Sequence, residues 1–173
     1  MARPLSKAAA DEARVILAAA REELTRADGK AALLLAASGV AIGALMAALL
    51  AGAWSPSDIA NGVEWIWWLG AVVATAGVGG LGYAVFPRTT YRGKDRPPEL
   101  IAYYGDVVKT PKDDLADRLT ETAASDGSSL VDQLVSVSNI VDKKYLGIQI
   151  GLIGLAGAAI LCAASVLLNL AAN

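Results

Sequence analysis

The sequence predicts an all-α membrane protein, in which three transmembrane helices are joined to cytoplasmic helices and the last transmembrane helix continues a long cytoplasmic one. Three apolar segments, 31–53, 65–86 and 146–170, contain no Asp, Glu, Lys or Arg. Each has about the 20 residues that a helix needs to cross a bilayer. Because lipid offers the backbone no hydrogen-bond partners, each segment has to be helical. Hydrophobic residues make up 55% of the chain, above the share in ordinary soluble domains.

Residues 1–30 are expected to form a cytoplasmic N-terminal helix. From about Ala8 to Ala27, alanine, leucine and charged residues alternate so that small and apolar side chains recur on one side at helical spacing. The helix is expected to run into the first span, with Gly29 as a candidate kink. Because a long charged stretch precedes the first apolar segment, the N-terminus does not look like a cleavable signal peptide, and the first span is expected to be an uncleaved anchor.

The first two spans are separated by an expected outer loop, 54–64, and the last two by an expected cytoplasmic helical module, 87–145. Within this module, Thr110 precedes a proline and two acids, which is typical of a helix start. That helix is expected to end near Gly127, and a further helix to start at Ser129. An apolar stripe from there into the third span predicts one helix of about 40 residues, roughly 60 Å long.

Charge distribution predicts the orientation of the chain. All 15 Lys and Arg residues lie before the first span or between the second and third. The positive-inside rule therefore predicts a multi-pass protein whose N-terminus is cytoplasmic and whose C-terminus lies outside. The tryptophans gather around the outer loop, where interfacial anchoring is the common role and a tryptophan-lined ligand pocket is the alternative; they are Trp54, Trp65, Trp67 and Trp68.

Small residues recur along the three spans at helical spacing, and such faces allow helices to approach closely in lipid. The sequence contains GxxxG at Gly39–Gly43 and again at Gly147–Gly151. The residues expected to pack helices are Gly39, Gly43, Gly147, Gly151 and Gly154. These faces can pack within one chain or partly between chains, and we expect a homo-oligomer because three thin spans leave little room for an internal pore.

The residue inventory excludes several classes of chemistry. The chain has no histidine and one cysteine, Cys162, which lies in an apolar stretch, so zinc sites, histidine-based triads and disulfide frameworks are excluded. No ionisable residue lies within a span, which argues against an ion-coupled transporter. The acid pair Asp113 and Asp114 is explained by a helix's first turn. We therefore expect no enzyme, no catalytic residue, no cofactor or metal site and no nucleic-acid partner.

One candidate site joins the cytoplasmic edges of two spans. Asp28 and Lys30 lie at the edge of the first span, and Lys143, Lys144 and Tyr145 lie at the edge of the third. If these helices are neighbours, Asp28 can pair with Lys144 and couple the cytoplasmic module to the membrane part. The alternative is that the lysines extend to anionic lipid, each contributing about 1 kcal/mol.

A second basic cluster follows the second span and consists of Arg88, Arg92, Lys94 and Arg96. Arginine matches the geometry of phosphate, so the cluster is a candidate contact for an anionic nucleotide or for lipid phosphate. The positive-inside bias explains the same residues without a ligand.

Three short motifs resemble the Pycsar effector transmembrane family (PycTM-like). They are Ala27-Asp28-Gly29-Lys30-Ala31 before the first span, Phe86-Pro87 after the second, and residues 134–145 before the third. The similarity extends over about residues 10–170. It implies an anti-phage effector in the bacterial inner membrane, encoded beside a pyrimidine cyclase. Infection would trigger synthesis of cyclic CMP or cyclic UMP, a candidate ligand, and the effector would then impair the membrane.

A constitutive membrane scaffold, or a plasmid-transfer component that docks cytoplasmic partners, is the alternative function. An adjacent cyclase gene would favour the effector, and a plasmid-transfer cluster would favour the scaffold.

Overall fold

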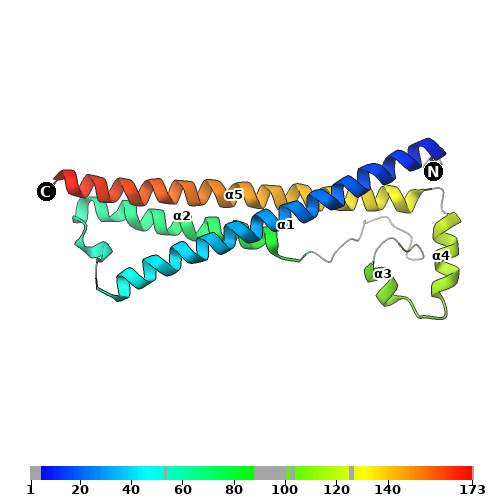
Figure 1. Cartoon of the computed structure of the whole chain (residues 1–173), viewed down its shortest axis with the longest axis horizontal. Coiled ribbons are helices and arrows are strands. Elements are labelled where there is room, and N and C mark those ends of the chain that lie inside the picture. Colours follow the sequence, from blue (N-terminus) through cyan, green and yellow to red (C-terminus); the bar gives the residue numbers. More distant parts are fainter. Residues whose placement is uncertain (1–4, 53, 88–100, 102–103, 125–126, 173) are drawn as a thin grey trace. The chain divides into compact units, whose positions relative to one another are not determined.

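The computed structural model describes residues 5–52, 54–87, 101, 104–124 and 127–172. Every regular element among these residues is a helix. In chain order (Figure 1) they are α1 (Lys7–Leu50), the short 3₁₀ helix η1 (Pro56–Asp58), α2 (Asn61–Val85), α3 (Tyr104–Lys109), α4 (Leu115–Ala124) and α5 (Ser128–Ala172).

Three of these helices are long and apolar enough to cross a membrane, namely α1, α2 and α5. The expected fold class is therefore confirmed, including the last span as the continuation of a long helix, since α5 has 45 residues. Helix α1 has 44 residues and continues through Gly29 without a break. The membrane boundaries and the assignment of each segment to one side of the bilayer stay predictions.

Contacts divide the chain into two units. The polar unit consists of Met1–Arg26 and Pro87–Asp142, and the apolar unit of Ala27–Phe86 and Lys143–Asn173. Helices α1 and α5 each contribute residues to both units. The boundary between the units falls within two residues of Asp28 on α1 and of Lys144 on α5, both of which are candidate coupling residues.

The start of α4 differs from the prediction. Its first residue is Leu115, and the Thr110 hydroxyl, expected to cap it, instead donates a 2.8 Å hydrogen bond to the Asp106 carbonyl of α3. The Thr110 amide donates to the same carbonyl at 3.0 Å. Thr110 thus closes α3, a short helix that the sequence did not predict. Gly127 follows α4, as expected, and has φ +80°, which favours glycine.

Helices α2 and α5 pack through glycines in the apolar unit. A Cβ atom built on Gly154 would lie 2.9 Å from the Cα of Gly77, and one on Gly80 would lie 3.2 Å from the Gly147 carbonyl oxygen. Next to Gly151 the Leu81 side chain is fully buried. Since lipid tails are as apolar as leucine, helices in a bilayer associate by such close backbone contact.

Helix α1 makes its close contact with the same pair of helices at one end of its apolar segment. Ala27 and Ala31 are fully buried in a cluster with Ala84 of α2 and Ile148 of α5. Further along α1, no atom lies within 4 Å of a Cβ built on Gly39 or Gly43. Figure 1 shows the last turns of α1 (cyan) apart from α2 and α5. Packing through Gly39 and Gly43 stays a prediction. Of the two possibilities, contact with another chain is the one left for these two glycines.

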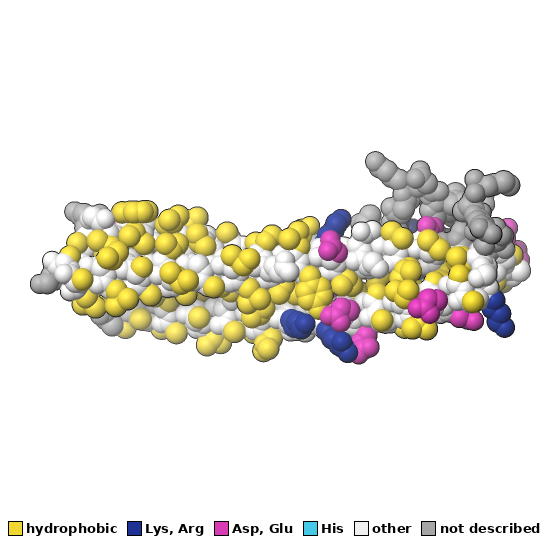
Figure 2. All heavy atoms as spheres, turned by 90° about the horizontal axis from the view of Figure 1, so that it is seen from above, with side chains coloured by type: hydrophobic (Ala, Val, Ile, Leu, Met, Phe, Trp, Pro, Cys, Tyr) yellow, Lys and Arg dark blue, Asp and Glu magenta, His cyan; other side chains and the backbone are white. Residues whose placement is uncertain are grey.

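Large apolar side chains on these helices face outward. Val40, Val72 and Ile153 are 75%, 65% and 73% exposed. Figure 2 shows the charged side chains in view gathered in one part of this face, with apolar side chains over the rest. Soluble proteins rarely expose apolar surface on this scale, so the apolar unit needs lipid around it.

Two alanine substitutions on α5 test the glycine contact. Gly154→Ala should lower the free energy of unfolding by about 1–3 kcal/mol, because the added methyl meets the backbone of α2, which cannot move aside easily. Gly157→Ala is the matched control, because its Cβ would lie at an ordinary distance of 3.9 Å from Val73. It should leave stability unchanged or raise it by about 0.5–1 kcal/mol through improved helix propensity.

The measurement is reversible unfolding of the purified protein in mixed micelles, followed by circular dichroism. Equal effects of the two substitutions would contradict the packing of α5 against α2.

Candidate functional site

Lys144 lies on α5, two residues before the apolar segment 146–170, yet its side chain is only 7% exposed. Its ammonium forms an ion pair with Asp28 of α1. It also donates a 2.7 Å hydrogen bond to the backbone carbonyl of Ala84 on α2. One cation therefore contacts all three long helices of the apolar unit, and we call this arrangement the three-helix junction.

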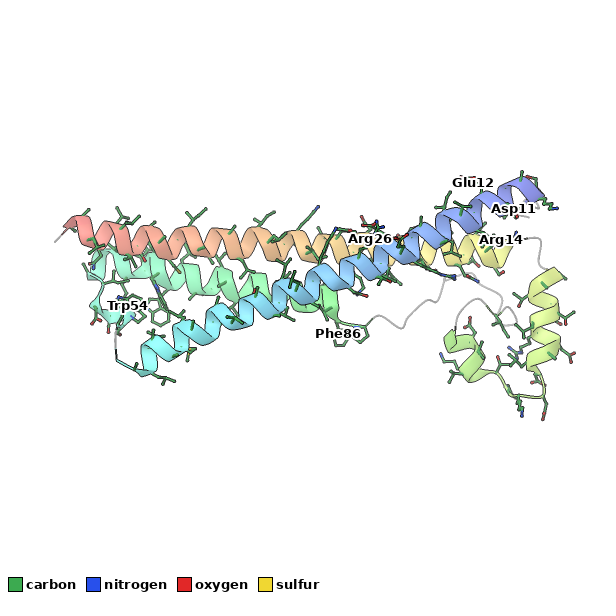
Figure 3. The ribbon with its side chains drawn as sticks, in the orientation of Figure 1. Asp11, Glu12, Arg14, Arg26, Trp54 and Phe86 are labelled. Carbon is green, nitrogen blue, oxygen red and sulfur yellow. The ribbon has the colours of Figure 1, made fainter. Side chains whose placement is uncertain are left out.

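The Ala84 carbonyl is available because α2 ends beside it. Phe86 precedes a proline and adopts an extended ψ of 126°, which stops the helix. The last four carbonyls of a helix have no intrahelical donor and carry the negative end of its dipole. The Phe86 amide satisfies the Gly82 carbonyl at 2.9 Å, and Lys144 satisfies that of Ala84. Figure 3 shows Phe86 at this end of α2, where its ring is 68% exposed.

Small side chains position the short Asp28 side chain for this contact. Ala27 and Ala31 flank Asp28 on α1 and have no exposed surface, because they pack on Ala84 and Ile148. Because Ala27 and Ala31 present only methyl groups to this cluster, α1 approaches closely enough for an aspartate to reach Lys144. The sequence had placed Ala27 and Ala31 on one side of the N-terminal helix and within the first family motif, without indicating which helix they contact.

A second link between α1 and α5 lies beside the first. The Lys30 ammonium donates a 3.2 Å hydrogen bond to the Tyr145 hydroxyl and lies 5.3 Å from the centre of the tyrosine ring, a cation–π geometry. Four of the five candidate coupling residues are thus brought together in two pairs. Lys143, the fifth, is exposed. A role of these residues in signal coupling stays a prediction.

The two partners of the ion pair differ in burial. The Asp28 side chain is 49% exposed, against 7% for Lys144. A buried ammonium without a counter-ion is strongly unfavourable, whereas a half-exposed carboxylate can be hydrated by water. The junction therefore depends on Asp28 staying in place more than on Lys144.

The polar unit contains a cavity of about 370 Å³, lined by residues that include Arg14, Thr122, Ser129 and Gln133. The Arg21 guanidinium donates a 3.1 Å hydrogen bond to the Gln133 side chain beside it. The volume of this cavity falls in the range of small-molecule sites, roughly 300–1,000 Å³. Sequence reasoning missed this cavity, since its residues come from three separate segments, 5–14, 119–123 and 127–133. The predicted phosphate-binding residues Arg88, Arg92, Lys94 and Arg96 lie outside the described residues.

Metal ligands do not gather in the part of the chain that the structure describes, where no group of three Cys, Asp or Glu residues could hold an ion. The junction itself is an electrostatic contact between helices. What it can do chemically is hold three helices together or release them.

Comparison with known proteins shows which family the chain resembles. A family model described as the Pycsar effector protein domain, PycTM, matches residues 12–171 and so includes every residue of the three-helix junction. No curated protein and no solved structure matches the chain. Because the family model covers nearly the whole sequence, the chain belongs to the PycTM family of Pycsar effector proteins.

Proposed function

We propose that the chain disturbs the bacterial inner membrane when a cyclic pyrimidine nucleotide signals phage infection. The family supports the role of a membrane effector in antiviral defence. The observation that carries the proposal is the three-helix junction, in which the buried ammonium of Lys144 binds both Asp28 and the end of α2.

The junction is placed to respond to movement of α1 or α5. Both helices also belong to the polar unit, which ends at Arg26 on α1 and at Asp142 on α5. A turn or tilt of either helix would separate Asp28 from Lys144. The ammonium would then be buried with one partner instead of two, so the resting arrangement of the three helices would lose stability.

Helix α1 is the part of the apolar unit that we propose to rearrange. Only 6% of its most apolar window is buried, against 22% for α2 and 17% for α5. Beyond Ala31, its small residues Gly39 and Gly43 have no neighbour within 4 Å of an added Cβ. In our proposal, the released α1 helices of several copies associate through this face and open the bilayer. The active effector is then a homo-oligomer that acts on the membrane by rearrangement and not as an enzyme.

The signal has two candidate binding sites in this chain. One is the cavity of the polar unit, where Arg14 can pair with phosphate and Gln133 can hydrogen-bond a base. The other is the basic cluster that includes Arg92. Either would place cyclic CMP or cyclic UMP at the cytoplasmic side, where a cyclase makes it, and neither requires a metal or a cofactor.

Substitutions at the ion pair test the coupling role. Asp28→Ala should raise dye uptake by cells that lack any cyclase, because it leaves the Lys144 ammonium buried without its counter-ion, at a cost of about 1–3 kcal/mol. Such a cost corresponds to a shift of roughly 5- to 150-fold between resting and released states. Lys144→Met should raise uptake less, because Asp28 is half-exposed and can be hydrated.

The double variant Asp28→Ala/Lys144→Met should be less leaky than Asp28→Ala alone, since no buried charge remains. Lys143→Met is the matched control, because it removes an exposed lysine from the neighbouring position. Propidium uptake is compared at equal protein levels, with active and inactive cyclase. If all variants behave as the parent does under both conditions, the pair is only an anchor. If the parent never admits dye, even with active cyclase, the effector role is wrong and a scaffold is favoured.

Isothermal titration of the detergent-purified protein tests direct sensing. We expect heat with cyclic UMP or cyclic CMP and none with cyclic AMP. Arg14→Gln should weaken binding at least tenfold if the cavity is the site, and Arg92→Gln should do so if the basic cluster is. Absence of heat with both pyrimidine nucleotides would contradict sensing by this chain.

Reporter fusions test the orientation. Alkaline phosphatase, active only outside the cytoplasm, should be active when fused after Asn173 and inactive before Met1, because all 15 basic residues lie in the segments assigned to the cytoplasm. The opposite pattern of activity would reverse the topology.

A further inference from the structure

A groove of about 680 Å³ separates α1 from α2 within the apolar unit. Ile42, Leu45 and Met46 of α1 line one wall, and Ala71 and Ala74 of α2 line the other. The three α1 side chains are 41–49% exposed. This surface belongs to segments that cross the bilayer, where an apolar groove is filled by acyl chains and not by water.

The groove exists because the two faces of α2 have different neighbours. The glycine face of α2, including Gly77 and Gly80, contacts α5 at backbone distance. The other face turns toward α1, which is held only at the Ala27–Ala31 end and stands apart further along. The space between them therefore opens away from the three-helix junction.

One end of the groove is polar and is surrounded by indoles. Ser55, Ser57 and Glu64 line it together with Trp67 and Trp68. The ring of Trp67 lies 5.0 Å from that of Trp68 in an edge-on arrangement, and 5.7 Å from that of Trp54, labelled in Figure 3. Indoles concentrate at the headgroup level of a bilayer. The groove thus runs from the headgroup level into the hydrocarbon, as a phospholipid does.

The charge at the mouth selects the headgroup. Residues 54–64 contain Asp58 and Glu64 but no Lys or Arg. Asp58 already accepts the Ser55 amide at 2.8 Å as the cap of η1. The Trp68 indole donates to one oxygen of Glu64, Oε1, at 2.9 Å, and orients this carboxylate at the mouth. A carboxylate without a nearby cation attracts an ammonium and disfavours a headgroup whose only charge is a phosphate.

We propose that the groove binds one phospholipid with a primary ammonium headgroup, such as phosphatidylethanolamine. One of its acyl chains lies between Met46 and Ala74, and its ammonium pairs with Glu64. The hydroxyls of Ser55 and Ser57 share a 2.7 Å hydrogen bond, so one of the two remains to donate to a phosphate oxygen. The lipid fills the space that separates α1 from α2. The proposal requires a bilayer around the apolar unit and does not depend on any nucleotide signal.

Native mass spectrometry and thermal unfolding of the full chain in detergent test it, with added phosphatidylethanolamine, phosphatidylcholine or phosphatidylglycerol. We expect one retained phosphatidylethanolamine and a rise in Tm of several degrees. Phosphatidylcholine, whose quaternary ammonium cannot donate a hydrogen bond, should do less, and phosphatidylglycerol least. Glu64→Gln should remove the preference among the three lipids.

Ala74→Phe should fill the groove and abolish retention of the lipid. Ala76→Phe is the matched control, because Ala76 is exposed on the same helix and does not line the groove. Equal retention of all three lipids by the parent protein would overturn the choice of headgroup. If Ala74→Phe still retains the lipid, the proposed site is wrong. The site is also wrong if light scattering shows that the parent protein is a dimer and that Ala74→Phe is not, because a second copy would then occupy the groove. If Ala74→Phe does not fold, the Glu64→Gln comparison decides. Each readout is taken without nucleotide, so its result is independent of the effector role.

Discussion

The close contact between α2 and α5 is the constraint on which the remaining structure of the apolar unit depends. A bilayer supplies no hydrophobic force between apolar helices, so these two helices depend on close backbone approach through glycine to stay in register. Gly77 and Gly154 provide that approach. Once α2 and α5 are in register, the end of α2 lies beside Lys144, and the ammonium meets the Ala84 carbonyl.

The third long helix, α1, is held by a different kind of interaction. Helix α1 joins the pair through alanines that pack at one end and through the Asp28 carboxylate. When the helices separate, water can hydrate the half-exposed Asp28 carboxylate, whereas the buried Lys144 ammonium loses its counter-ion until the helices meet again. Packing by glycine is therefore the permanent contact of this unit, and the ion pair is the reversible one. This difference makes α1 the mobile helix in the proposed function.

Much of the fold and the main contact of the site could be predicted from the sequence. Uncharged segments longer than 20 residues indicate spans whatever their neighbours are, and a charged residue at the edge of each of two spans suggested Asp28 with Lys144. The Ala84 carbonyl was missed because a backbone acceptor has no sequence signature; the stop at Phe86-Pro87 was the one available signal. The short helix α3 was missed because Thr110 is equally suited to close one helix or to start the next.

The two GxxxG motifs show most clearly where prediction from sequence ends. Gly39–Gly43 and Gly147–Gly151 have the same spacing, yet the second meets a helix in this chain and the first does not. The difference depends on how close each helix lies to α2 at the position of its motif, and that is set by contacts elsewhere. On α1 the buried alanines and Asp28 hold the helix against α2 and α5 at one end. Further along, α1 diverges from α2 and α5, so Gly39 and Gly43 have no neighbour within 4 Å of an added Cβ, and Ile42 and Met46 line the groove that opens there. The divergence of α1 thus accounts for both the unpaired glycines and the proposed lipid site, so a movement of α1 toward α2 would change both.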